Sequence, residues 1–162
     1  MRQKILLQQF LCLLITSFLV IGTSYGQKTK REEIYKNKLY KEYMDANYYY
    51  DDNNNINSTQ IMLYAQDLRY QHIVELTTIY FGSPHDLLKF IIDVEKFANE
   101  NEADVSNTID GRRVNIVEQM GIKGFTIYEK DGSGYKVFTF KNWRKIKEAL
   151  IEWAEEKNVS LE

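Results

Sequence analysis

The strongest constraint on the fold is a change of pattern at Gly82-Ser83-Pro84, where a strand-like segment ends and a helix-like segment begins. The residues from Ile73 to Phe81 are mostly β-branched or aromatic, which is typical of a strand. Ser83 is a favourable helix N-cap, Pro84 suits the first helical position, and an acidic residue follows three positions after the cap. Apolar residues then recur every three or four positions, so the sequence predicts a helix from Pro84 to about Asn99.

Two turn signals after this helix predict two hairpins. Asp110-Gly111 is typical of a two-residue hairpin turn, and Asp131 to Gly134 predicts a four-residue loop. The four strands that these turns would join are Val105–Ile109, Arg112–Glu118, Phe125–Lys130 and Tyr135–Phe140.

The loop length of the second hairpin predicts its register. With four residues in the loop, Phe125 faces Phe140 and Ile127 faces Phe138. Aromatic and branched side chains then share one face of the hairpin, and such cross-strand pairs stabilise a sheet by about 0.2–1 kcal/mol each.

The C-terminal segment carries an amphipathic pattern. Trp143, Ile146, Leu150 and Trp153 recur at spacings of three and four residues, which predicts a helix with an apolar stripe. The resulting order, strand, helix, four strands and helix, predicts an α+β fold. It would be a two-layer sandwich in which two helices pack on one face of a mainly antiparallel sheet of about five strands. No internal repeat is visible in the sequence.

The region before these elements is highly charged. Between residues 27 and 46, some of the apolar side chains repeat at helical spacing, so we expect a charged helical arm there. Residues 47–60 are rich in Tyr, Asp and Asn, and because Asp and Asn favour turns we expect a loop. The predicted organisation is an arm and loop over residues 27–60, followed by a single α+β domain over residues 61–162.

The first 26 residues have the layout of a secretory signal peptide. A cationic head with Arg2 and Lys4 precedes an apolar run from Phe10 to Ile21, and small residues occupy the −3 and −1 positions of a cut before Gln27. The run is about 12 residues long, short of the ~20 that a membrane-spanning helix needs. We expect cleavage before Gln27, a secreted or periplasmic protein, and no stable membrane span afterwards. A leader that stays uncleaved as an anchor is the alternative.

Cleavage would leave a cysteine-free chain with a mildly acidic balance. The one cysteine, Cys12, lies in the leader, so the remaining 136 of the 162 residues would contain no disulfide, thiolate metal site or cysteine nucleophile. The leader holds two of the 21 basic residues and none of the 23 acidic ones, which leaves 19 against 23, a net charge of −4. Because binding to a phosphate backbone needs clustered Lys and Arg, we expect no nucleic-acid partner.

Groups suited to catalysis are sparse. His72 and His85 are the only histidines available for acid–base chemistry, and the chain has no Gly-x-Ser-x-Gly nucleophile motif. Nothing in the sequence singles out a carboxylate pair of the glycosidase type. A small hydrolase that uses carboxylates with His72 or His85 is therefore the alternative hypothesis and not the leading one.

The Asn-rich segment matches a calcium loop only in part. Asp51, Asn53 and Asn55 occupy the first three ligand positions, but Ile56 stands where glycine is required and Met62 where glutamate is required. Two distant histidines and no cysteines make no zinc site, and no glycine-rich phosphate loop is present. The sequence therefore predicts no metal and no cofactor.

Two groups of residues are candidates for binding a partner. Tyr48, Tyr49 and Tyr50 lie beside the Asn-rich segment, and tyrosine supplies a large contact area at low entropic cost. The second group would lie on the sheet face opposite the helices: Arg113, Asn115, Thr126, Tyr128, Val137 and Thr139. With few catalytic groups in an exported chain, we expect a binding module, such as an accessory subunit, inhibitor or adhesion protein, whose partner is another protein or a surface polymer.

Overall fold

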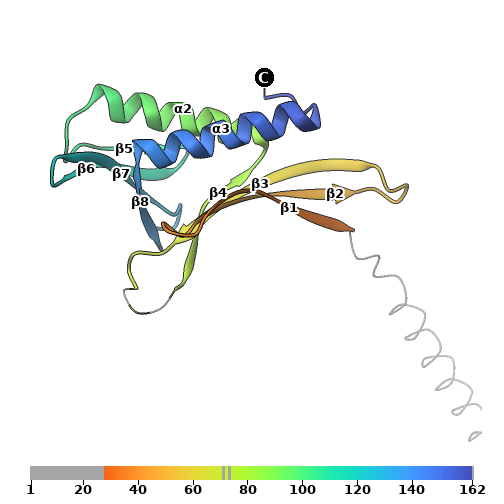
Figure 1. Ribbon diagram of the computed structural model, residues 1–162, viewed down its shortest axis with the longest axis horizontal. Coiled ribbons are helices and arrows are strands. Elements are labelled where there is room, and N and C mark those ends of the chain that lie inside the picture. Colours follow the sequence, from red (N-terminus) through yellow and green to blue (C-terminus); the bar gives the residue numbers. More distant parts are fainter. Residues whose placement is uncertain (1–27, 71, 73, 162) are drawn as a thin grey trace, which may run out of the picture.

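The computed structural model describes residues 28–70, 72 and 74–161. It has an α+β architecture with two antiparallel sheets of four strands each and two helices (Figure 1). The predicted leader, including Cys12 and the cut before Gln27, lies outside the described residues, as does Ile73. Within the described ranges, no helix is both long enough and apolar enough to cross a bilayer.

The first sheet, sheet A, is built from four consecutive strands and is followed by a helix. Each strand pairs antiparallel with the one before it. The elements are β1 (Thr29–Asn37), β2 (Glu42–Tyr50), β3 (Ile56–Gln66), β4 (Leu76–Gly82) and α2 (Pro84–Glu100).

The second half of the chain repeats this order of elements in sheet B. The elements are β5 (Ser106–Ile109), β6 (Arg112–Gln119), β7 (Ile122–Tyr128), β8 (Tyr135–Thr139) and α3 (Phe140–Lys157). The described chain is therefore two successive units of four strands and a helix. This structural repeat has no visible counterpart in the sequence.

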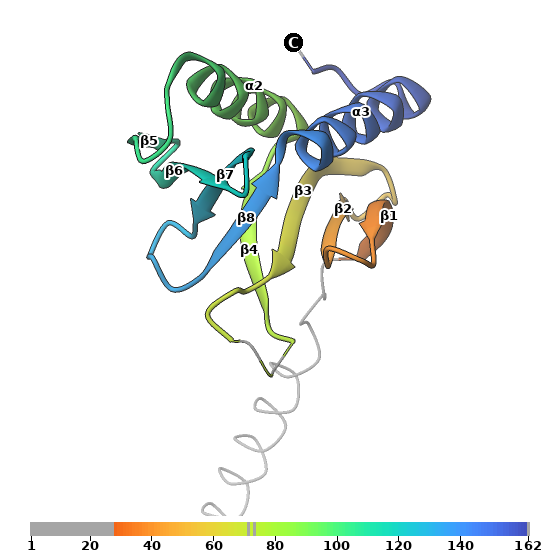
Figure 2. The same ribbon diagram turned by 60° about the vertical axis from the view of Figure 1, so that its left-hand side comes forward.

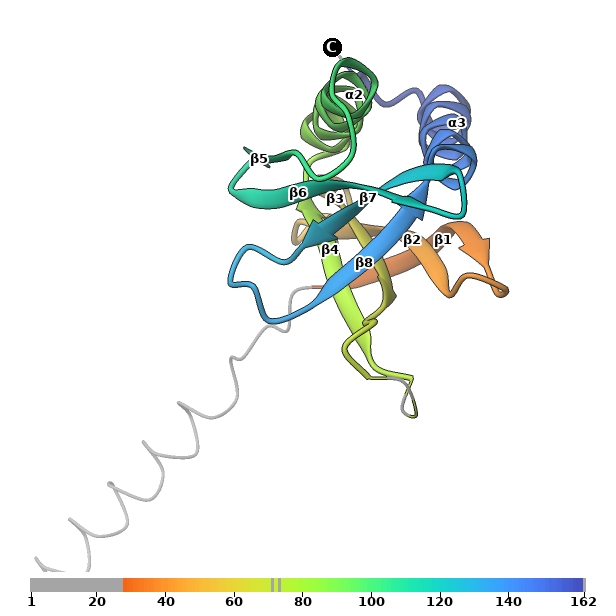
Figure 3. The same cartoon turned by 90° about the vertical axis from the view of Figure 1, so that its left-hand side faces the viewer.

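The two halves meet along β4 and β8. Both helices lie side by side on the same side of the sheets (Figures 1 and 3), and β4 passes beside β8 (Figure 2). The backbone N–H of Leu68, just after β3, donates to the carbonyl of Tyr135 at 3.1 Å. Gly134 permits this close approach, because a Cβ atom there would overlap the side chain of Thr77.

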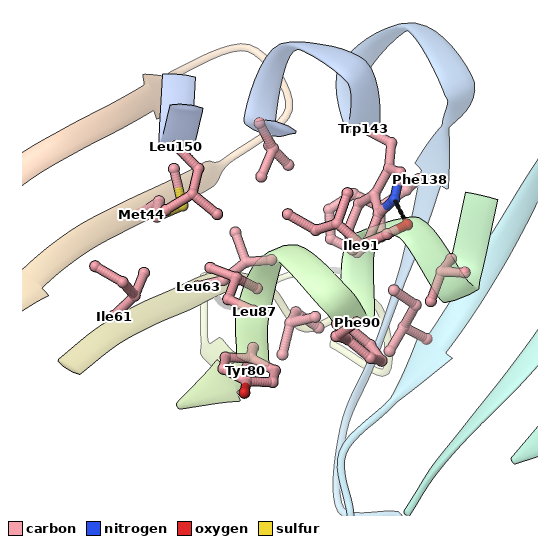
Figure 4. Close-up of a cluster of buried hydrophobic side chains, with 14 of the residues drawn as sticks. Met44, Ile61, Leu63, Tyr80, Leu87, Phe90, Ile91, Phe138, Trp143 and Leu150 are labelled. Atoms are coloured by element: carbon pink, nitrogen blue, oxygen red, sulfur yellow. Dashed lines mark hydrogen bonds between the residues drawn. The ribbon is translucent and has the colours of Figure 1, made fainter. Parts of the chain in front are cut away.

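Trp143 on α3 forms the centre of the core. Its ring lies edge-on to Phe90 of α2, with 6.1 Å between centroids. It contacts Phe125 and Phe138 of sheet B at 5.2 and 5.0 Å. The indole N–H donates to the carbonyl of Ile91 at 3.2 Å (Figure 4). Buried side chains of sheet A belong to the same cluster, so both sheets and both helices share one core.

Three predicted elements are confirmed. Helix α2 begins at the expected proline, and Ser83 Oγ accepts a hydrogen bond from the backbone N–H of Asp86 at 3.1 Å. Asp110 and Gly111 form the turn between β5 and β6, with left-handed φ angles of 47° and 72°. Helix α3 buries the predicted apolar stripe.

The predicted N-terminal helical arm is wrong, because residues 29–37 and 42–50 form β1 and β2. Side chains on β2 alternate along the strand, and those that face the core are Glu42, Met44, Ala46 and Tyr48. This two-residue alternation is typical of a strand, and it outweighs the weaker three- to four-residue spacing that predicted a helix. Strand β1 lies at the edge of sheet A, where its charged side chains oppose pairing with other chains.

The predicted loop over residues 47–60 forms only at its centre. Strands β2 and β3 extend into it from both sides, so the turn is confined to residues 51–55. The Asp51 carboxylate accepts the backbone N–H groups of Asn53 and Asn55 at 2.9 and 2.8 Å. The predicted single sheet of about five strands is accordingly wrong, since β1 and β2 complete a second sheet.

The second predicted hairpin forms, but its register differs from the prediction by two residues. Phe125 faces Phe138 and not Phe140. The difference arises because the four-residue loop begins one residue earlier than predicted: the backbone N–H of Glu129 donates to the carbonyl of Gly134 at 2.9 Å, which leaves residues 130–133 as the loop. A shift of two residues leaves each side chain on its predicted face.

Candidate functional site

Tyr48 lies in the core and not on the surface. Its side chain is 5% exposed. The hydroxyl donates to Glu32 Oε2 at 2.6 Å and accepts the indole N–H of Trp153 at 3.2 Å. Burial is the main cause that raises the pKa of Tyr48. Because the side chain joins β2 to β1 and α3, it has no surface to offer a partner.

Tyr49 and Tyr50 do not form a patch with Tyr48. Successive residues of a strand point to opposite faces, so Tyr49 lies on the side of sheet A that faces away from the core. A register shift separates Tyr49 from Tyr50, and Tyr50 packs partly buried against the core. The structure therefore separates the three predicted tyrosines.

The second candidate group gathers on one side of sheet B, facing away from α2 and α3; we call this side the outer face of sheet B. The Arg113 guanidinium lies 4.0 Å from the centroid of the Tyr128 ring. Asn115 Nδ2 donates to the Tyr128 hydroxyl at 3.4 Å. Tyr135, which the sequence reasoning missed, adds a second ring 5.5 Å from that of Tyr128. These residues form a cationic and aromatic cluster.

The other three predicted residues of this face have different environments. Thr126 is buried, with 4% of its surface exposed. Thr139 Oγ1 accepts the backbone N–H of Asn142 at 3.2 Å and so caps α3. Val137 is half-buried and lines a hollow.

This apolar hollow, of about 260 Å³, lies on the outer face of sheet B. It is lined by Val117, Gln119, Met120, Ile122, Gly124, Val137, Phe138 and Thr139. Met120 is fully exposed and Ile122 is 64% exposed. The sequence reasoning missed the hollow because it missed the Met120-Gly121 turn, whose glycine was the available signal. Both turn residues have left-handed φ angles, 53° and 75°.

A separate groove runs along α2. One hollow of about 500 Å³ lies between α2 and β4, and a second of about 550 Å³ lies between α2 and β5. The two share Asp93 and Asp110, so they are neighbours. We call the pair the α2 groove.

The side chain of Arg112 is buried beneath the α2 groove. Its Nε donates to the carbonyl of Ile79 at 2.6 Å, and its guanidinium forms an ion pair with Asp110. The guanidinium carbon lies 4.8 Å from the centroid of the Tyr80 ring and 5.3 Å from that of Phe90. Burial raises the pKa of Tyr80 to about 12, and nearby carboxylates add to the effect.

The far side of sheet A carries a second cluster that the sequence reasoning missed. Asp45, which is 3% exposed, forms an ion pair with Arg31 and accepts the Tyr64 hydroxyl at 2.7 Å. The Tyr43 ring stacks on the Tyr64 ring with 5.2 Å between centroids. Burial is the main cause that raises the pKa of Tyr64 to about 12. Because these groups bind one another, the cluster holds β1 on β2 and β3.

The two histidines lie apart from these sites. His85 Nδ1 is 3.0 Å from the carbonyl of Leu161, and His72 is exposed. Neither lines the apolar hollow or the α2 groove. In the part of the chain that the structure describes, no group of three or more His, Cys, Asp or Glu side chains is arranged to hold a metal ion. This geometry gives the hydrolase hypothesis no support.

Comparisons of this chain with protein-family models, with curated proteins and with solved structures found no match, so no residue role is carried over from another protein.

Proposed function

We propose that this protein is a small exported binding module whose partner is another protein, docked on the outer face of sheet B. The observation that carries the proposal is that one sheet face carries both an apolar hollow and the cluster of Arg113, Tyr128 and Tyr135. Tyr, Met and Arg are enriched at protein interfaces, and an apolar patch rimmed by polar groups is typical of an interaction site. Export rests on the predicted leader.

The backbone at Met120 supports this choice of surface. A left-handed φ is unfavourable for methionine, whereas Asn or Gly would occupy the position with little strain. The side chain is fully exposed, so it contributes no packing within the chain. A strained and exposed apolar residue is consistent with a role in contacting a partner.

The expected partner has an apolar side chain that enters the hollow and an acidic group that faces Arg113. Arg113 has no carboxylate partner among the described residues, so a partner acid would form a new charge-assisted bond. A buried apolar anchor with a charged rim is the usual arrangement of an interface in which few residues dominate the affinity.

Affinity capture with matched baits tests the proposal. The baits are the chain from Gln27, the double variant Met120→Asp/Ile122→Lys, and the control Leu39→Asp/Val74→Lys. The control makes the same changes at apolar residues that are 81% and 62% exposed but lie elsewhere. A partner identified by mass spectrometry should bind the first and third baits and lose at least tenfold in affinity for the second when remeasured with purified proteins. Equal affinity for all three would contradict the proposal.

A further inference from the structure

We propose that the α2 groove is a second binding site, independent of the outer face of sheet B, and that its ligand is a saccharide. The hollow between α2 and β4, of about 500 Å³, has the size of a small-molecule pocket, and the second hollow lies next to it. Such a groove suits a chain of a few sugar units, with the first unit beside β4.

An unpaired hydroxyl on Tyr80 points to a ligand. The side chain is 4% exposed, yet its hydroxyl has no hydrogen-bond partner among the described residues. Figure 4 shows this hydroxyl directed away from the buried apolar cluster, and Tyr80 lines the hollow. The hydroxyl is not among the enclosed atoms that lack a partner, so it opens into the hollow, where it is free to bond to a ligand group.

Gly82 keeps space beside this hydroxyl. A Cβ atom on Gly82 would lie 2.8 Å from the Tyr80 hydroxyl oxygen. The φ angle of Gly82 is not in the left-handed region, so its backbone does not require glycine. Space next to the hydroxyl is therefore the structural reason for glycine at this position.

The charges of the hollow favour a neutral ligand with many hydroxyl groups. Asp86, Lys89 and Asp93 alternate in sign along α2, and none of the three has an ion-pair partner within the described residues. On the opposite wall Asp110 is already paired with Arg112 and with Lys130.

With three carboxylates, two ammonium groups and the guanidinium beneath, a net-charged ligand gains little overall attraction. A sugar hydroxyl donates to a carboxylate and accepts from an ammonium group, so one ligand can bond to both.

Phe81 supplies the apolar contact that a sugar ring needs. It lines the same hollow, and 49% of it is exposed. The C–H face of a pyranose can pack on the flat face of such a ring while its hydroxyl groups bond to the charged walls. Together with Tyr80, this combination distinguishes the hollow from an ordinary charged helix surface.

An NMR titration of the ¹⁵N-labelled chain from Gln27 tests the proposal. The probes are methyl glycosides of glucose, galactose, mannose and N-acetylglucosamine with their β-1,4-linked dimers, and the non-saccharide controls are glycylglycine and inorganic phosphate. We expect saturable shifts for at least one saccharide, confined to the amides of residues 80–101, 107–112 and 130, the segments that line the α2 groove. No saturable shift with any saccharide, or equal shifts with glycylglycine, would overturn the proposal.

Two variants locate the binding. Tyr80→Phe keeps the buried ring and removes only the hydroxyl, so it should fold and bind the saccharide about three- to tenfold more weakly, the loss expected for one hydrogen bond. Tyr135→Phe, on the outer face of sheet B, should bind as the unmodified chain does. Unchanged affinity of Tyr80→Phe overturns the proposal. Met120→Asp/Ile122→Lys should leave the titration unchanged, so this proposal and the protein-docking proposal fail separately.

Discussion

Trp153 of α3 donates its indole N–H to the hydroxyl of Tyr48 in β2, at 3.2 Å and across 105 positions of the chain. The same hydroxyl donates to Glu32 of β1 at 2.6 Å. One phenol group therefore connects the last helix to the first two strands. Its position explains why a tyrosine in a segment rich in Tyr, Asp and Asn belongs to the core.

We expect Tyr48→Phe to lower the free energy of unfolding by about 1–2 kcal/mol, because the change leaves a buried indole N–H without its acceptor. Tyr49→Phe is the matched control and should change the free energy of unfolding by less than about 0.5 kcal/mol, since Tyr49 is only half-buried and faces away from the core. Urea unfolding followed by tryptophan fluorescence measures both. Equal effects of the two changes would show that Tyr48 does not connect these elements.

Thr77→Val should stabilise the protein. Thr77 Oγ1 is the only side-chain N or O atom among the described residues that is buried without a hydrogen-bond partner. Replacing it with a methyl group of similar shape removes the unpaired polar atom and should raise the free energy of unfolding by about 1 kcal/mol. Thr139→Val makes the same chemical change at the N-cap of α3, and it should lower the free energy of unfolding by about 1 kcal/mol because the cap is lost. Thermal unfolding midpoints that move in the same direction for both variants would contradict this account.

Glu42 should make stability depend on pH. Glu42 is fully buried, and burial raises its pKa above the ordinary value of 4.5. A carboxyl whose pKa is higher in the folded state stabilises the fold fully below its unfolded pKa, and the contribution is lost as the pH rises through the folded pKa.

The control variant for Glu42 is Glu42→Gln, which is neutral at every pH and retains one side-chain oxygen as an acceptor for either Asn37 or Asn142. The unfolding free energy of the unmodified chain, relative to this variant, should decrease as the pH rises above 4.5. A relative stability that increases with pH would mean that attraction to Lys136 outweighs burial. Denaturant unfolding at a series of pH values decides between these outcomes.

Met120→Asn should separate stability from binding. Asparagine tolerates the left-handed φ at this turn, so the variant should be more stable by about 0.5–1 kcal/mol. If the outer face of sheet B binds a protein, the same change should weaken binding, because it removes an exposed apolar side chain. Met120→Leu keeps both the strain and the apolar surface, and should behave as the unmodified chain in both assays. A Met120→Asn variant that binds normally would exclude Met120 from the contact.

The elements that the sequence predicted correctly are those whose signals are local. The Ser83 cap, the Asp110-Gly111 turn and the stripe of α3 each depend on residues within one element or turn. Strands β1 and β2 were missed because their charged side chains resemble a solvated helix. The alternation of core-facing and outward-facing side chains along β2 becomes visible only when β2 is paired with β3.

The candidate surface was predictable to a similar extent. Alternation along β6 places Arg113 and Asn115 on one face, which the sequence indicates, whereas their proximity to Tyr128 depends on the register between β6 and β7. The hollow beside them depends on how the Met120-Gly121 turn meets β8, which no local pattern specifies. The α2 groove likewise requires the long-range approach of α2 to β4 and β5.

Trp143 also determines when the chain is able to fold. It occupies the middle of the core but belongs to the last helix, so a polypeptide still emerging from the ribosome has an unfilled interior until its final segment appears. Sheet A and α2 are made first and pack on each other, but the part of the core that Trp143 fills stays open before then. Docking of α3 is therefore the step that joins the two sheets into one core.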